Sequence, residues 1–139
     1  MMIVIFLFWF FLGHMIFALF LGLTTMTNIS TSFEVFLTAN GLLMLGVGTL
    51  VGLGFAVLIY AISVIGLPLL LDREVDFVTA MIASIGAVRA SPFVMVLWAL
   101  LIAVACFAAL LPGFVGLLII LPWLGHASWH LYRLLASTA

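Results

Sequence analysis

The feature that most constrains this chain is the run Asn40–Pro68, NGLLMLGVGTLVGLGFAVLIYAISVIGLP, which contains no charged residue. A helix that crosses a bilayer needs about 20 mostly apolar residues, because the hydrocarbon core is about 30 Å thick and a helix rises about 1.5 Å per residue. No water is present at that depth, so a helix must satisfy its backbone polar groups internally. The run therefore predicts a transmembrane helix over about residues 40–70.

The composition of the whole chain agrees with a membrane environment. Of the 139 residues, 69% are hydrophobic and 5% are charged, whereas soluble domains average about 25% charged residues. Lipid, or the apolar flank of other membrane subunits, is therefore expected around most of the surface. The net charge of −1 excludes the basic patch that a nucleic-acid-binding protein requires. The single cysteine excludes an internal disulfide.

Further apolar runs predict three more spans, at about residues 3–23, 93–111 and 114–134. Pro112 and Gly113 predict a tight turn between the last two spans. The hydroxyl-rich stretch Thr24–Thr38 predicts a loop outside the membrane. Together these runs predict an all-α integral membrane bundle of four transmembrane helices, in a single domain over residues 1–139.

The segment at about residues 73–90 departs from this pattern. Charged residues gather at Asp72, Arg73, Glu74 and Asp76, and apolar residues then recur at three- and four-residue spacing. The pattern predicts one amphipathic helix lying in the membrane surface, with Asp72 as its N-cap. Its polar face is small, so contact with lipid headgroups and contact with protein both stay open.

The basic residues predict the orientation of the chain. Counting the spans places Arg73, Arg89 and Arg133 on one side of the membrane. The positive-inside rule assigns that side, and with it both termini, to the cytoplasm. Asp72 or Asp76 is then expected to pair with Arg73, Arg133 or a nearby histidine, which would form a polar cap at the cytoplasmic end of the bundle.

Small residues in the second span predict a helix-packing face. Gly48, Gly52 and Ala56 repeat at four-residue spacing, so they form a ridge along which another helix backbone can approach closely. The partner helix could belong to this chain or to another subunit, and the sequence leaves both open.

The histidines are the candidates for a metal or haem site. His126 and His130 stand four residues apart, so they share one face of a helix, and two imidazoles at this spacing can bind Zn, Cu or Ni. A haem needs an axial ligand on a second helix as well, and His14 in the first span is the available one. The structural alternative is that these imidazoles bond to backbone or to the acidic cluster. Trp129 and Tyr132 are predicted as interfacial residues.

Several stretches resemble a known family: LPLLLDREVDFVTAMIASI, the tryptophan in VLWALLIA, LPWLGHASWHLYR, and Trp9 with the following IFALFLG. They resemble the C-terminal half of an uncharacterised bacterial integral membrane family, domain of unknown function 2189, whose members are sometimes labelled cytochrome c oxidase subunit I-like. Typical members have further N-terminal spans. The positions that carry the resemblance are Pro68, Leu71, Asp72, Arg73, Asp76, Ala80, Ser84, Trp98, Pro122, Gly125, His126, Trp129, His130 and Tyr132.

Two function classes follow. The first is a non-catalytic accessory subunit of a larger, energy-transducing (respiratory or photosynthetic) complex in the bacterial inner membrane. The second is a haem- or metal-binding membrane protein that uses His126 and His130, with His14 as a further ligand. Candidate bound groups are haem, a metal ion, a quinone or lipid. Half of a transporter ranks last, and no enzymatic activity is expected, because no nucleophile–base pair emerges.

Overall fold

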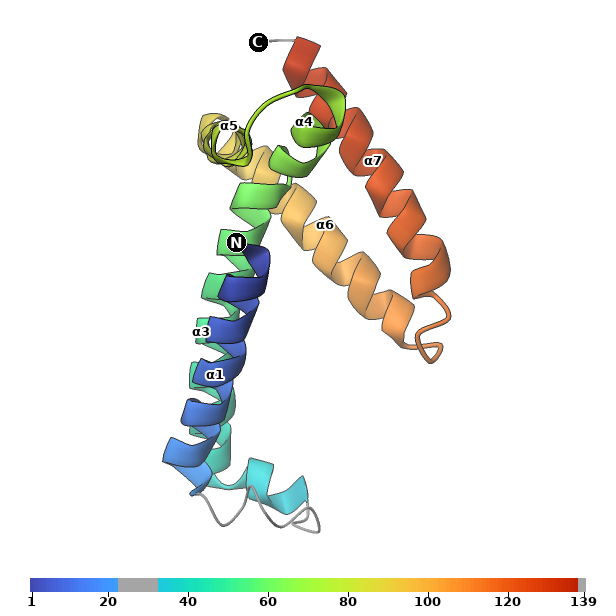
Figure 1. Ribbon diagram of the computed structural model, residues 1–139. Helices are drawn as coiled ribbons and strands as arrows, with labels where there is room; N and C mark the ends of the chain where they lie inside the picture. Colours follow the sequence, from blue (N-terminus) through green and yellow to red (C-terminus); the bar gives the residue numbers. More distant parts are fainter. Residues whose placement is uncertain (23–32, 138–139) are drawn as a thin grey trace. The chain divides into compact units, whose positions relative to one another are not determined.

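The computed structural model describes residues 1–22 and 33–137, which form helices and connecting turns and contain no strand. The all-α prediction is therefore confirmed. The helices are α1 (Met2–Leu21), η1 (Phe33–Leu37), α3 (Ala39–Ser63), α4 (Gly66–Asp72), α5 (Phe77–Ala90), α6 (Pro92–Leu110) and α7 (Leu117–Ser137) (Figure 1). The chain divides into two compact units, Met1–Ile59 (unit 1) and Tyr60–Ala139 (unit 2).

Within the described residues, three helical segments are long and apolar enough to cross a bilayer: Met2–Leu21, Ala39–Asp72 and Pro92–Leu110. They agree with three of the four predicted spans. The expected fourth span, 114–134, corresponds to α7. This helix falls short in hydropathy because histidines and an arginine interrupt its second half.

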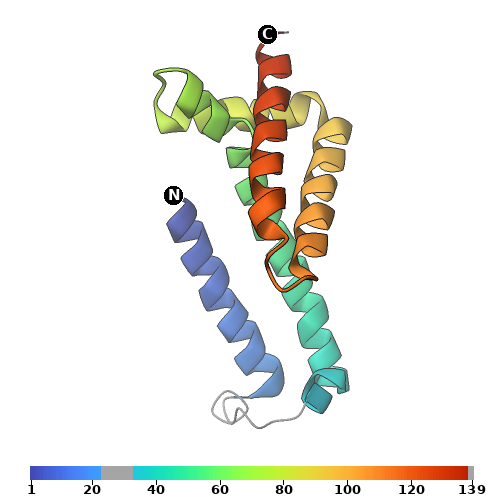
Figure 2. The same ribbon diagram turned by 90° about the vertical axis from the view of Figure 1, so that its right-hand side faces the viewer.

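Unit 1 contains α1 and most of α3, which run in opposite directions (Figure 2). Of the loop predicted over Thr24–Thr38, residues 24–32 lie outside the described part of the chain. η1 then leads into α3, where the hydroxyl of Thr38 accepts the N–H of Gly41 at 3.1 Å. Gly41 itself lies against η1, because a Cβ at this position would collide with the carbonyl of Val35. The entry into α3 is thus fixed by local capping.

The predicted helix over residues 40–70 is broken between α3 and α4, which corrects the sequence analysis. The physical reason is Pro68, whose ring clashes with the carbonyl four residues earlier, that of Val64. The break frees the N–H of Ile65, which donates to the Oγ of Ser84 on α5 at 3.1 Å. Gly66 then approaches α5 closely, because a Cβ there would lie 3.2 Å from the carbonyl oxygen of Ala80.

The amphipathic helix predicted over 73–90 begins later, as α5 at Phe77, and its N-cap is Asp76 instead of Asp72. The chain is extended after Asp72, so only the carboxylate of Asp76 reaches the first free N–H groups of α5. It accepts the N–H of Val78 and that of Thr79, both at 3.0 Å. The hydrogen bonds from Thr79 lower the pKa of Asp76 below its usual range.

Helices α6 and α7 of unit 2 form a hairpin, as Pro112 and Gly113 predict. In its turn, Gly113 and Phe114 adopt left-handed backbone conformations. Gly116 lies where a Cβ would be 2.6 Å from the carbonyl oxygen of Ala109, so the turn requires glycine there. α7 continues through Pro122.

The core of unit 2 lies where α4, α5, α6 and α7 meet. Its buried side chains are Val64, Ile65, Met95 and Tyr132, with Tyr60 and Trp98 among the partly buried residues around them. The Tyr60 hydroxyl donates to the backbone carbonyl of Met95 at 2.8 Å. This bond fixes the C-terminal end of α3 against α6.

Candidate functional site

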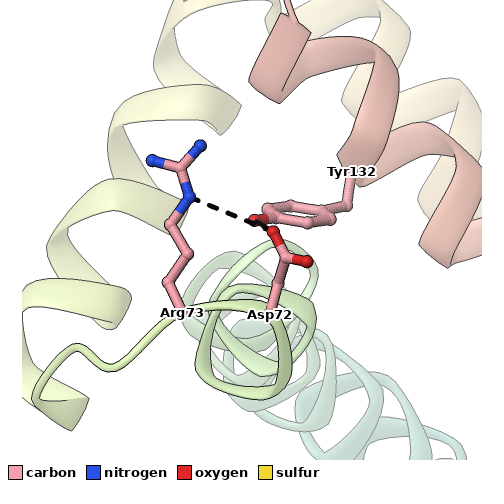
Figure 3. A network of polar contacts seen from close by, with 3 residues as sticks. All are labelled: Asp72, Arg73 and Tyr132. Atoms are coloured by element: carbon pink, nitrogen blue, oxygen red, sulfur yellow. Dashed lines mark hydrogen bonds and ion pairs between the residues drawn. The ribbon is translucent and has the colours of Figure 1, made fainter.

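The polar side chains of unit 2 meet where α4 ends beside α7. The hydroxyl of Tyr132 donates to the carboxylate of Asp72 at 2.7 Å, and the two residues are sixty positions apart in sequence. Arg73 lies alongside, with its Nε 3.9 Å from the same carboxylate (Figure 3). The side chains of Arg73 and Asp72 are 63% and 41% exposed, so this ion pair is weak. The tyrosine–carboxylate bond is the stronger connection.

The predicted polar cap is therefore present only in part. Asp72 and Arg73 meet as expected, and the third member of the cluster is Tyr132, which is buried within unit 2. The carboxylate of Asp76 instead caps the N-terminus of α5. Arg133 is exposed, and no ion pair forms between it and another described residue.

Two hydroxyl groups elsewhere in unit 2, one buried and one partly buried, bond to backbone. Ser84 is fully buried and accepts the N–H of Ile65, while Tyr60 donates to a carbonyl of α6. The buried indole Nε1 of Trp98 has no hydrogen-bond partner in the described part of the chain. The bonds of Ser84 and Tyr60 thus connect a side chain of one helix to the backbone of another segment.

The two C-terminal histidines lie on one exposed face of α7, as their spacing predicts. The rings of His126 and His130 are 5.5 Å apart between centroids, in an edge-to-face arrangement. Nowhere in residues 1–22 and 33–137 do three His, Cys, Asp or Glu side chains gather to hold a metal ion. His14 lies in unit 1. If a metal ion bound here, the histidine pair could supply two of its ligands.

Unit 1 holds a groove between α1 and α3 with a volume of about 790 Å³. Its walls are mainly apolar and aromatic, and the polar side-chain groups among its described lining residues are the imidazole of His14, the hydroxyl of Thr49 and the indole N–H of Trp9. Small-molecule sites in proteins have volumes of about 300–1,000 Å³ and combine apolar walls with a few polar groups. The residues that matter for its chemistry are Trp9, Phe10, His14, Gly48, Thr49 and Gly52.

The predicted packing ridge lies on this groove. Gly48 and Gly52 both line it, and a Cβ at Gly48 would meet no atom within 4 Å. At Gly52 the nearest atom to such a Cβ is the indole Nε1 of Trp9, at 3.4 Å. Ala56 is exposed. The ridge is therefore approached closely at Gly52, by the side chain of Trp9 on α1. Beside Gly48 the groove is open.

Sequence reasoning missed three of these roles. Ser84, Tyr60 and Thr49 are hydroxyl residues within apolar helices, and no local pattern marks them. The available signal is Pro68, because a helix break there frees a backbone N–H that a nearby hydroxyl can accept. The bond from Tyr132 to α4 joins distant parts of the sequence, which no local pattern reports.

Comparison with known proteins gives one family match. A model of predicted integral membrane proteins, with domain of unknown function 2189, matches residues 1–72. Of the positions that carry the resemblance, this range includes Trp9, Pro68, Leu71 and Asp72 and none from Arg73 onward. The match supports neither the assignment to the C-terminal half of the family nor the oxidase label. No curated protein and no solved structure matches the chain. The match spans more than half of the 139 residues, and the chain belongs to this family of predicted integral membrane proteins.

Proposed function

We propose that this protein is a non-catalytic accessory subunit of a larger, energy-transducing complex in the bacterial inner membrane. The observation that carries the proposal is how unit 2 uses its buried and partly buried polar side chains. Ser84, Tyr60 and Tyr132 each hold one helix against another, through a backbone group or the carboxylate of Asp72. Such bonds suit a protein that braces its neighbours.

The surface of unit 1 supports contact with other subunits. None of the twenty residues of α1 is buried, and α3 carries glycines on the side turned away from the groove. Residues two positions apart point to nearly opposite sides of a helix, so Gly46 faces away from Gly48. A Cβ on Gly46 or on Gly54 would meet no atom within 4 Å. Open glycines on an apolar helix allow another helix to approach closely.

The topology we propose has four spans, α1, α3, α6 and α7, with α5 at the membrane surface and both termini in the cytoplasm. The bond between Asp72 and Tyr132 supports it, because their neighbours Arg73 and Arg133 then lie at the same end of unit 2. Single cysteines that replace Arg73 or Arg133, in a Cys106→Ser background, should react with an impermeant thiol reagent from the same side of the membrane. Labelling from opposite sides would overturn this topology.

The accessory role is tested by native purification of the full chain in a mild detergent. We expect a fixed set of membrane proteins to co-purify in constant ratio, and to be recovered again when one of them carries the tag instead. Gly46→Leu should weaken this association, whereas Gly48→Leu, on the opposite side of the same helix, should leave it intact. Recovery of the chain alone, with tags at either terminus, would refute the proposal.

Metal or haem binding by His126, His130 and His14 stays a prediction, and the exposed ring pair on α7 is the observation that favours it. Metal analysis and a visible absorption spectrum of the purified chain test it. A Soret band or a bound metal that is lost in His126→Ala would support this second function.

A further inference from the structure

The groove of unit 1 contains a histidine whose hydrogen-bonding role is fixed by its own helix. The Nδ1 of His14 lies 2.9 Å from the carbonyl oxygen of Phe10. A carbonyl only accepts, so Nδ1 carries the proton, and Nε2 of the neutral ring is left as an acceptor. The ring of Phe10, 4.2 Å from the imidazole between centroids, packs against it. An acceptor without a donor is unfavourable in a hydrocarbon environment, so the groove suits a molecule that donates a hydrogen bond.

The second polar group of the groove has the same preference. The hydroxyl of Thr49 donates to the carbonyl of Leu45 at 2.7 Å, so its oxygen lone pairs are left to accept. No Asp, Glu, Lys or Arg is among the described residues that line the groove, so these walls offer no partner for an ionic ligand. Its complement is a neutral molecule with hydroxyl donors.

The walls indicate the shape of that molecule. Trp9, Phe10 and Phe17 line the groove, and aromatic rings pack favourably against other aromatic rings in offset or edge-to-face arrangements. Gly48 keeps the opposite wall free of a side chain.

We infer that the groove between α1 and α3 binds a neutral, aromatic, hydroxyl-bearing amphiphile, a hydroquinone with an apolar tail. One hydroxyl donates to Nε2 of His14, the ring packs between the aromatic side chains and the glycine face of α3, and the tail extends into lipid. This binding site goes beyond the accessory role and does not depend on it, because all of its residues belong to unit 1 of one chain.

The test uses the full chain in phosphatidylcholine nanodiscs and decylubiquinol as the probe, titrated by calorimetry with empty nanodiscs subtracted. We expect saturable binding with about one molecule per chain. His14→Phe keeps the aromatic shape but removes the acceptor, and should weaken binding about 2- to 13-fold, the effect of one lost hydrogen bond. The dimethyl ether of the probe, which has no donor, should bind the unmodified chain weakly by a similar factor.

Matched variants of α3 locate the site. Gly48→Leu should abolish saturable binding because the new side chain fills the groove, whereas Gly46→Leu, two residues away on the opposite side, should not change it. If Gly48→Leu does not fold, as judged by its thermal unfolding, Thr49→Val takes its place and should weaken binding. Equal binding of the quinol and its ether, equal effects of the two leucine variants, or no heat above that of empty nanodiscs would overturn the inference. Each of these results is independent of co-purification.

Discussion

Replacing Ser84 by alanine should expose the energetic cost of the break between α3 and α4. The hydroxyl of Ser84 is fully buried and is the acceptor for the N–H of Ile65. A buried donor that loses its partner costs about 1–3 kcal/mol, so Ser84→Ala should lower the free energy of unfolding by that amount. This corresponds to about a 5- to 160-fold change in the equilibrium constant.

The measurement is reversible unfolding in detergent micelles, followed by circular dichroism. Ser91→Ala is the matched control: Ser91 is the N-cap residue of α6 but makes no side-chain capping bond, so its loss should change stability by less than about 0.5 kcal/mol. The same result for both variants would refute the role assigned to Ser84.

A second substitution tests why the break exists. If Pro68 causes it, Pro68→Ala allows the N–H of Ile65 to return to a carbonyl within the helix. Ser84→Ala should then cost less in the Pro68→Ala background than alone, and a double-mutant cycle measures the difference. Strictly additive effects would show that the two residues do not act on the same backbone group.

Two further predictions concern the ends of α4 and α5. Tyr132→Phe removes the hydroxyl bonded to Asp72 and should lower the free energy of unfolding by about 1.5 kcal/mol. This value is the lower end for a hydrogen bond to a charged group, because the carboxylate is partly exposed. Chemical unfolding measures the change, and an unchanged stability would show that water replaces the bond. Hydrogen bonding lowers the pKa of Asp76 in the folded state, so its contribution to stability is fully present above the unfolded pKa of about 3.9 and is lost as pH falls through the folded pKa. Asp76→Asn keeps a capping side chain without this titration and should show a weaker loss of stability in acid, and an unchanged pH dependence would contradict the assignment.

Much of the secondary structure could be predicted, because it depends on local patterns. The apolar runs locate α1, α3 and α6, and the proline–glycine pair locates the hairpin turn. Helix starts were predicted less well: Asp72 and Asp76 are both acceptable N-caps in sequence, and only the extended backbone after Asp72 decides between them.

The candidate sites divide in the same way. Spacing alone placed His126 beside His130 and Gly48 in line with Gly52, since neighbours on one helix are fixed by its pitch. The groove beside His14 depends on a second helix, and so does the bond between Asp72 and Tyr132.

Charge content and the length of apolar runs decide which solvent a helix tolerates, so both are enough to predict helices that are apolar enough for a bilayer. What the few polar side chains do depends on how the helices pack. A hydroxyl or an imidazole in an apolar helix acquires its role from the group that packing brings within hydrogen-bonding distance, and for Ser84 and Tyr132 that group lies on another helix.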